Sequence, residues 1–415
     1  MASVSSEQRI LKRLHAVTFI FAILVTSNTW AGGLFFSEYA TTASVGTAGV
    51  GGITNTTTAE AGVTNPAGLV GLKTNQLQLG LQIVDLTAEF KSTSPTVGKK
   101  DGGSTELVPA VFYAYRLNDN IVLGTSFHAA GALSFDYGSD WAGKNFLNDV
   151  EFAFLNLTGS IGYRVNDQFA IGGALVIQQF SLDLSTTVPP LRPSGTERKQ
   201  SSDGDDVTPG FNLGLMYDLS DDTRIGFHYT SKIEHELDMD WDSARFPLLD
   251  KFLSGNFDLK ITTPASYTLG GSHQLDQQWR LMARLAYEQW SDFGELTAKT
   301  DIGTIDGNMN LEDIYDIGIA AEYRTPAWTV YTGISYQEAI VSEEDRLISL
   351  PADKSWKLGV GGEWALGNDS YFGLAYELVL IDEAKLSQSN IRGTRTLEGK
   401  MSDYYIQFLS ASYRY

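Results

Sequence analysis

Most of the chain consists of long segments in which apolar residues alternate with small or charged ones. Within residues 279–290, Leu281 and Leu285 fall on one face of an extended chain, whereas Met282 and Arg284 fall on the other. Alternation with a period of two is typical of a β-strand with one apolar face. The segments run to about ten to eighteen residues, longer than the usual strand of five or six. The sequence therefore predicts a protein built almost entirely of long β-strands.

The connections between these segments alternate between short and long. Short polar turns are expected at 118–119, 166–167, 220–222, 276–277, 325–326 and 367–369. Longer loops are expected at 91–104, 138–149, 184–206, 240–256, 292–307, 342–352 and 384–398. The segments between these breaks number about fourteen, and an even number of strands with short turns at one end is typical of a bacterial outer-membrane barrel. Closure of such a barrel satisfies every backbone amide within the lipid.

A soluble β-sandwich would show the same alternation, with its apolar face turned inward. The length of the strands and the absence of cysteine from a secreted chain favour the membrane barrel. Aromatic residues near the strand ends also favour it, because they are typical of the girdles at the two membrane interfaces. These residues are Trp279, Trp290, Tyr323, Trp328, Trp356 and Trp364. We therefore expect an all-β transmembrane barrel over residues 74–415.

The N-terminal residues have the layout of a secretory signal peptide. Basic residues at 9–13 precede an apolar run at 16–25, and small polar residues lead to Ala31. We expect a signal peptide at residues 1–31, with cleavage after Ala31. A short anchor helix is the alternative, which the short apolar run disfavours.

The composition excludes several classes of site. The 415 residues include no cysteine, which excludes disulfides and a thiolate metal site. The formal net charge of -20 argues against a basic surface for nucleic acid. We expect neither a cofactor nor a metal.

Residues 32–73 do not alternate and are rich in glycine, alanine and threonine. A flexible linker is the alternative, but Phe35, Phe36, Ile53 and Leu69 are among many apolar residues that a solvated linker would lack. Small residues allow a backbone to pack tightly in a confined space, and a barrel of this size needs filling or encloses a channel. We therefore expect a hatch, or plug, inside the lumen.

The chain ends in YYIQFLSASYRY, where Tyr405, Leu409, Tyr413 and Tyr415 share one face. This pattern suits a last strand that closes the barrel, although an ordinary amphipathic strand would also alternate. The terminal aromatic residue is similar to the signal that the barrel-assembly machinery recognises. We therefore expect this machinery, outer-membrane lipid and lipopolysaccharide as partners, and a Gram-negative outer membrane as the location.

The segment GTAGVGGITNTTTAEAGVTNPAGLVGL resembles the N-terminal hatch of the FadL/TodX family of outer-membrane transporters. The resemblance continues at residues 156–175, 263–296, 328–339 and 350–364, and thus covers nearly the whole mature chain. It implies a fourteen-stranded barrel with an N-terminal hatch. It also implies uptake of hydrophobic compounds, with long-chain fatty acids favoured and aromatic hydrocarbons or alkanes as the alternative.

The resemblance implies functional positions in the hatch and in the third strand. The hatch of the family ends in an Asn-Pro-Ala triplet, which here is Asn65, Pro66 and Ala67, followed by Gly68. In the family, the substrate leaves sideways through a gap where the third strand is kinked. The corresponding lateral gate is expected at Ala129, Ala130 and Gly131, although the proline that the family often has near this point is absent from the segment.

External loops supply the capture groove in the family. The candidates for apolar contacts are Leu191, Phe246, Leu248, Leu249, Phe252 and Leu253. Exposed apolar residues of this kind mark a binding or membrane site, or else pack the loop over the barrel mouth. A carboxylate head group would need a cation, for which Arg192, Arg284 and Arg324 are candidates.

Two other functions fit a barrel. An outer-membrane lipid-modifying enzyme needs a nucleophile oriented by histidine and an acid, but the mature chain has only four histidines, none within a recognisable motif: His128, His228, His235 and His273. His128 is expected to be a structural residue of the lumen. An open, water-filled porin would lack a plug. No catalytic residues are therefore expected.

Overall fold

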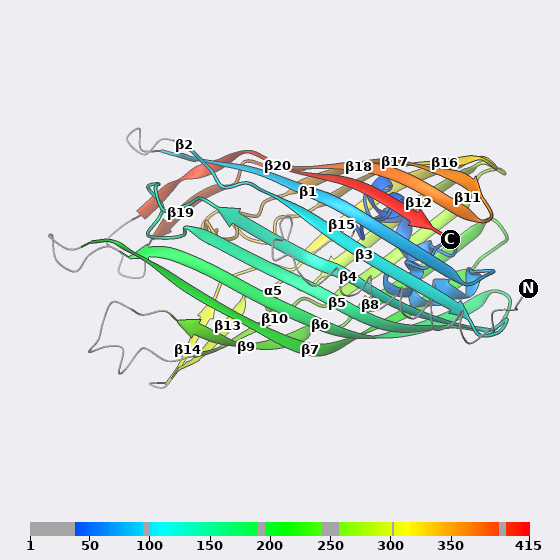
Figure 1. Ribbon diagram of the computed structural model, residues 1–415, viewed down its shortest axis with the longest axis horizontal. Helices are drawn as coiled ribbons and strands as arrows, with labels where there is room; N and C mark the ends of the chain where they lie inside the picture. The colour runs from blue at the N-terminus through cyan, green and yellow to red at the C-terminus, as the bar shows by residue number, and fades with distance from the viewer. Residues whose placement is uncertain (1–37, 94–98, 189–195, 242–256, 301–302, 390–395) are drawn as a thin grey trace, which may run out of the picture.

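The computed structural model describes residues 38–93, 99–188, 196–241, 257–300, 303–389 and 396–415. These residues form one closed antiparallel barrel, elongated along its axis, with the C-terminus at the end where the N-terminal short helices lie (Figure 1). The signal peptide expected at residues 1–31 and the first residues of the expected hatch lie outside this description.

The first half of the wall contains nine strand segments. They are β1 (Gln76–Ser92), β2 (Lys99–Asp101), β3 (Ser104–Arg116), β4 (Ile121–Asp136), β5 (Asp149–Arg164), β6 (Phe169–Val188), β7 (Arg198–Asp218), β8 (Thr223–Thr230) and β9 (Ile233–Trp241). The second half contains β10 (Phe257–Thr263), β11 (Ser266–Gln274), β12 (Trp279–Glu288), β13 (Glu295–Thr300), β14 (Gly303–Asn308), β15 (Ile314–Arg324), β16 (Trp328–Gln337), β17 (Ser355–Gly367), β18 (Ser370–Ile381), β19 (Lys385–Ser389) and β20 (Thr396–Arg414).

These segments make up 14 wall strands. The pairs β8–β9, β10–β11, β12–β13 and β14–β15 are each one wall strand interrupted by a few residues, and β2 and β19 are short segments that flank the wall at the long-loop end. The last strand closes the barrel, because β20 pairs with β1 from Gln78↔Arg414 to Ser92↔Gly399. The predicted barrel and its strand number are thereby confirmed.

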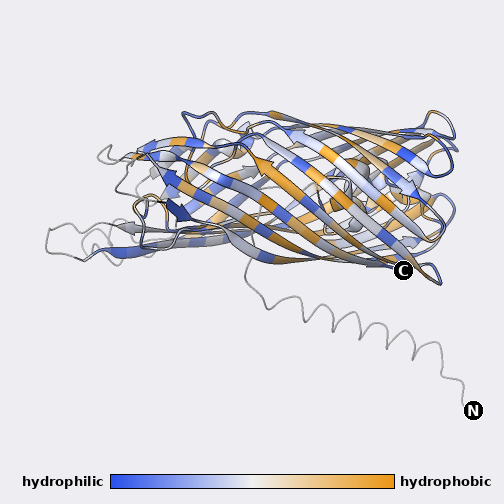
Figure 2. Cartoon of the chain, turned by 90° about the horizontal axis from the view of Figure 1, so that it is seen from above, coloured by the Kyte–Doolittle hydropathy of each residue, from blue (hydrophilic) through white to orange (hydrophobic). Residues whose placement is uncertain are grey.

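The two faces of the wall differ as the alternation predicts. Leu281 and Leu285 are exposed on the outer face of β12, whereas Met282 and Arg284 are buried in the lumen. Apolar and polar residues alternate along the tilted strands (Figure 2). Trp279, Trp328, Trp356 and Trp364 are exposed near strand ends, as expected for an interfacial girdle.

Trp290 was predicted to belong to that girdle, and this prediction is wrong. Its side chain is 2% exposed and packs against Phe293 in the lumen. The reason is local: the wall strand is interrupted after β12 by the helical turn α5 (Ser291–Gly294), which turns the ring inward. The loop expected at 292–307 is therefore largely structured, since β13 and β14 follow as a hairpin.

Short helices fill the end of the barrel that carries the short turns (Figure 1). They are α2 (Thr42–Gly46), η1 (Val50–Thr54), α3 (Ala61–Thr64) and η2 (Pro66–Gly71). Nearly every residue from Ala40 to Leu72 is buried. This segment is the predicted hatch. No helix among the described residues has the length and apolar character needed to cross a membrane.

The lumen beyond the hatch, toward the long loops, is packed with apolar side chains. Large fully buried residues there come from many strands, among them Phe90, Phe135, Tyr137, Phe154, Phe180, Leu237 and Met239. The interior of a water-filled porin is polar instead. An apolar lumen favours molecules that leave water readily.

Candidate functional site

The hatch is fixed at the triplet that the sequence singles out. Asn65 caps η2, because its Oδ1 accepts the backbone N–H of Ala67 at 3.2 Å. Its Nδ2 donates to the carbonyl of Ile53 at 2.9 Å within the hatch and to that of Leu215 on β7 at 3.1 Å. Pro66 opens the short helix at a position where no backbone N–H is required. One side chain thus joins two parts of the hatch to the wall.

Glycines on both sides allow this close contact. A Cβ added at Gly68 would lie 2.0 Å from the carbonyl oxygen of Asn55. On the wall, a Cβ at Gly172 of β6 would lie 2.3 Å from the nitrogen of Ala67, and one at Gly214 of β7 would lie 2.2 Å from Oδ1 of Asn65. Other inward-facing glycines receive the rest of the hatch in the same way: Gly80, Gly226, Gly270, Gly318, Gly333, Gly359 and Gly373. We call these nine wall glycines the glycine collar.

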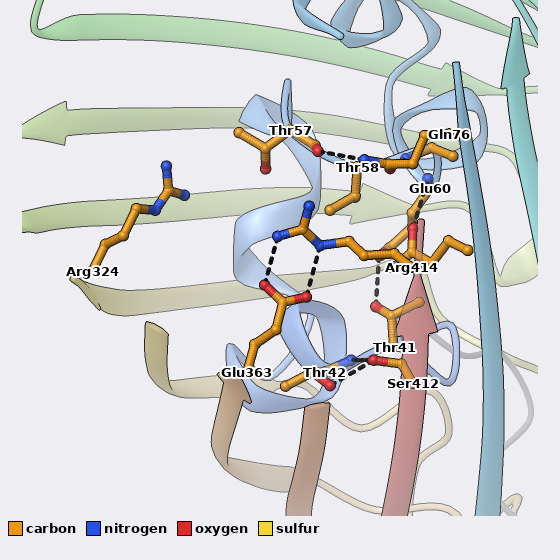
Figure 3. Close-up of polar contacts among 12 residues, drawn as sticks. Thr41, Thr42, Thr57, Thr58, Glu60, Gln76, Arg324, Glu363, Ser412 and Arg414 are labelled. Carbon is orange, nitrogen blue, oxygen red and sulfur yellow. Dashed lines mark hydrogen bonds and ion pairs between the residues drawn. The ribbon is translucent and has the colours of Figure 1, made fainter. Parts of the chain in front are cut away.

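Polar contacts join the hatch to the closing strands (Figure 3). The hydroxyls of Thr42 and Ser412 on β20 are 2.6 Å apart. Oε1 of Gln76, at the start of β1, accepts the N–H of Ala59 at 2.6 Å, and its Nε2 donates to the carbonyl of Thr57. The hatch is therefore hydrogen-bonded to the strands that close the barrel.

Glu60 is a buried carboxyl within the hatch. It accepts the hydroxyl of Thr41 at 2.6 Å, and its N–H donates to Gln78 of β1 (Figure 3). Burial raises the pKa of Glu60 to about 7, although hydrogen bonds from Thr41 and Ser44 oppose the shift. Docking of the hatch is thus coupled to a proton near neutral pH.

A cavity of about 160 Å³ lies above the hatch. The hatch contributes Tyr39, Ile53 and Val63 to its floor, and the wall contributes apolar residues such as Ala130 and polar residues such as Gln178. A second cavity of about 100 Å³, lined mostly by apolar residues, shares Gln337 and Lys357 with the first. A cavity of mixed polar and apolar lining therefore lies directly against the hatch, and a more apolar one adjoins it.

The two candidate cations for a head group that the structure describes do not lie together, and both are already paired with acidic residues. Arg284 lines the cavity but pairs with Asp316 at 2.6 Å and donates to the carbonyl of Gly49. Arg324 lies beside the short turn after β15 and pairs with Glu322 at 2.6 Å. Figure 3 shows its side chain apart from the hatch contacts. Arg192 lies outside the described residues.

The barrel wall has a window between β3 and β4. The two strands pair from Arg116↔Val122 only as far as Val111↔Phe127, and beyond this point β3 continues to pair with β1. The two strands are in contact again at the long-loop end, where the hydroxyl of Ser104 on β3 donates to the carbonyl of Ser134 on β4 at 2.9 Å. Between these limits the two strands have no backbone pairing.

The window coincides with the expected kink. The register of β4 against β5 shifts between Ala129 and Gly131, which leaves Ala130 as a bulge. From His128 to Leu133 every residue of β4 is buried except Ala130, which is half-buried. Because both faces of this stretch of β4 are covered, the stretch lies displaced from the lipid-facing wall toward the lumen. His128 and Ala130 line the first cavity and Leu133 lines the second, so the window adjoins both.

A proline missed by the sequence reasoning lies on the other side of the window. Pro109 stands in the part of β3 that has no partner on β4. Proline cannot donate to a ladder and is confined to edge positions. A proline in the middle of an otherwise regular strand was the available signal, but it belongs to the strand before the expected one.

The other candidate residues have the following positions. The groove residues Leu191, Phe246, Leu248, Leu249, Phe252 and Leu253 lie outside the described residues. His128 packs edge-on against Tyr39 of the hatch and shares a 3.3 Å contact with Ser126. His235 contacts Asp206 and Gln178, and His273 contacts Thr223. No described histidine stands between a hydroxyl and a carboxylate.

Comparison with known proteins decides the family. The profile of the family described as outer membrane protein transport protein (OMPP1/FadL/TodX) matches residues 22–415. The chain belongs to this family. The family comprises outer-membrane transporters of hydrophobic compounds, so the protein is an outer-membrane transporter and not an enzyme.

Relatives of the FadL/TodX family agree in sequence and in fold. The long-chain fatty acid transport protein of Escherichia coli O6:H1 is 26% identical over 326 residues, which cover 69% of this chain and 72% of that protein. The 47 kDa outer membrane protein of Pasteurella multocida is 26% identical over 324 residues, covering 71% and 74%. A Pseudomonas aeruginosa FadL homologue superposes with a TM-score of 0.84 at 20% identity, over 92% of this chain and 99% of that one. The Pseudomonas putida toluene transporter TodX gives a TM-score of 0.69 at 20% identity, covering 91% and 98%.

Proposed function

We propose that this protein takes up hydrophobic compounds, with long-chain fatty acids as the first candidates, and releases them sideways through the window between β3 and β4. The observation that carries the proposal is the position of the window. It adjoins both cavities above the hatch, at the one stretch of β4 where backbone pairing with β3 stops.

The route follows from where apolar surface lies. A substrate leaving water gains about 25 cal/mol per Å² of buried apolar area, which favours entry into the packed apolar lumen. The docked hatch blocks the direct path along the axis. A sideways exit would place the molecule in the membrane without returning it to water.

The substrate class rests on relatives and on chemistry. One matched relative is named a long-chain fatty acid transport protein and one superposed structure is a toluene transporter. Either kind of molecule suits an apolar lumen. Aromatic hydrocarbons or alkanes are therefore the second candidates for this chain.

Blocking the window tests the route. Gly131→Val adds an isopropyl group beside the bulge of β4, and we expect uptake of a long-chain fatty acid to fall by about tenfold or more if the window is the exit. Uptake would be measured with a radiolabelled fatty acid in cells that lack their own transporter. Gly159→Val is the matched control, because a Cβ there meets nothing within 4 Å.

Surface amount and the heat-dependent gel mobility of both variants would be compared, so that loss of folding is not mistaken for loss of transport. Normal uptake by a folded Gly131→Val variant would rule out the proposed exit.

A further inference from the structure

Three polar side chains in the wall of the cavity above the hatch have no hydrogen-bond partner. They are Thr158 on β5, Asn212 on β7 and His228 on β8, which are 2%, 7% and 7% exposed. Within the described residues, the buried atoms that have no hydrogen-bond partner are Oγ1 of Thr158, Oδ1 of Asn212 and Nε2 of His228. Burying such a group without a partner costs about 1–3 kcal/mol.

Other polar groups on neighbouring strands of the barrel are paired. Gln178 donates to Asn156 at 2.9 Å, and its carbonyl oxygen lies 3.1 Å from Nε2 of His235. Nδ1 of His235 lies 2.8 Å from Asp206. Since buried polar groups in folded proteins are usually paired, three unpaired groups lining one cavity indicate a missing partner.

The strand register brings two of the three groups close together. Asn212 is opposite Thr230 and His228 is opposite Gly214, so Asn212 and His228 occupy diagonal positions on neighbouring strands. Diagonal neighbours on one face lie about 7–8 Å apart at the backbone, within reach of a shared small group. Thr158 is on β5, three strands from His228, and therefore lines the same cavity at a separate position.

The charges around the cavity do not favour an anion. Arg284 is paired with Asp316 at 2.6 Å and Lys357 is paired with Glu38 at 3.1 Å. Glu288 also lines the cavity, and its carboxylate accepts the indole N–H of Trp290. An ionised head group would have to displace one of these pairs and would meet an additional acid.

We propose that Asn212 and His228 form a subsite for the uncharged O–H group of an amphipathic substrate, such as a long-chain alcohol or a protonated carboxylic acid. This subsite rests on the proposed uptake function and narrows its substrate class. A hydroxyl needs one donor and one acceptor. The Asn212 amide offers both, and the neutral imidazole of His228 offers one of each.

The test compares three twelve-carbon ligands on the purified full chain. Binding of tritiated dodecan-1-ol, dodecane and ionised dodecanoate at pH 8 would be measured by scintillation proximity. We expect dodecan-1-ol to bind more tightly than either of the others. The double variant Asn212→Leu with His228→Leu should lower its affinity by about tenfold, as expected for two lost hydrogen bonds, and leave dodecane within about twofold.

The control variant is Thr329→Val, an inward-facing threonine of β16 that does not line the cavity. Heat-dependent gel mobility would show that each variant is folded, and Asn212→Leu alone provides a second variant. Equal loss of dodecan-1-ol and dodecane, or tighter binding of ionised dodecanoate, would overturn the subsite while leaving uptake in place. Failure of all three ligands to bind would overturn the proposed uptake function as well.

Discussion

At the residue scale, the fit of the hatch depends on missing side chains. Asn65, Pro66 and Ala67 lie against Gly172 and Gly214 at distances that leave no room for a Cβ. Sequence reasoning identified the triplet, but not the glycines that receive it. The reason is that a glycine inside a strand can equally mark a bulge or a bend, and the partner that it accommodates is more than 100 positions away in the chain.

Gly172 and Gly173 offer a matched pair for testing that fit. A Cβ at Gly172 would lie 2.3 Å from the hatch backbone, whereas one at Gly173 would make an ordinary contact of 3.7 Å. We expect Gly172→Ala to weaken docking of the hatch by about 1–3 kcal/mol, as overpacking does. Weaker docking would be measured as faster hydrogen exchange of the backbone amides of residues 57–68. Equally slow exchange in both variants would contradict the close fit.

The buried carboxyl of Glu60 makes docking depend on pH. The docked pKa of about 7 is above the ordinary value of 4.5, so the docked form holds the proton more tightly than a released, hydrated hatch. Docking is strongest below pH 4.5, weakens as the pH rises toward 7, and is then constant. The rise in the pKa of Glu60 corresponds to about 3 kcal/mol of docking free energy that is lost between low and high pH.

We therefore expect hydrogen exchange of the hatch, corrected for intrinsic rates, to be faster at pH 8 than at pH 5. Glu60→Gln should remove most of this difference, because the amide stays neutral. The exposed Glu312→Gln should leave it unchanged. A pH dependence that persists in Glu60→Gln would show that another group is responsible.

At the scale of elements, periodicity predicted the strands well and their interruptions poorly. The alternation in residues 279–290 correctly assigned Leu281 and Arg284 to opposite faces. It could not show that the strand stops at Glu288 and turns through α5, because Trp290 and Phe293 are as typical of an interfacial girdle as of a lumen. The partial loss of pairing between β3 and β4 likewise depends on contacts across strands, which the sequence of one strand does not contain.

The hatch as an element can be removed. Deleting residues 32–64 leaves every wall strand intact, and we expect a larger steady conductance in planar bilayers, because the short-turn end of the bore loses α2, η1 and α3. Residues 65–73 remain, so part of the packing against β5, β6 and β7 is kept. Conductance unchanged from the full chain would mean that the hatch does not close the bore.

At the scale of the whole molecule, the barrel closes through a seam of three strands, with β20 paired to both β1 and β18. Near the chain terminus Arg414 forms a two-point ion pair with Glu363, with both distances 2.8 Å (Figure 3). Its guanidinium also lies 3.6 Å from the ring centre of Tyr371. This contact links the last strand to β17 and β18. Sequence reasoning predicted the closing strand but not this contact.

We expect Arg414→Ala to destabilise the closed barrel by about 3 kcal/mol or more, because it leaves the largely buried Glu363 unpaired. The unfolding temperature, read from heat-dependent gel mobility, should fall. Lys385→Ala is a suitable control, since it removes an exposed ion pair with Glu343 whose contribution is small. Equal effects of the two substitutions would show that the pair with Glu363 adds nothing to closure.

The glycine collar has a consequence for how such a barrel can be changed. Because the collar is spread over strands all around the wall, the hatch and the barrel cannot be exchanged independently between relatives. A transplanted hatch would meet methyl groups wherever the new wall lacks a matching glycine. A functional chimera would therefore need to carry the inward-facing small residues of its donor along with the hatch.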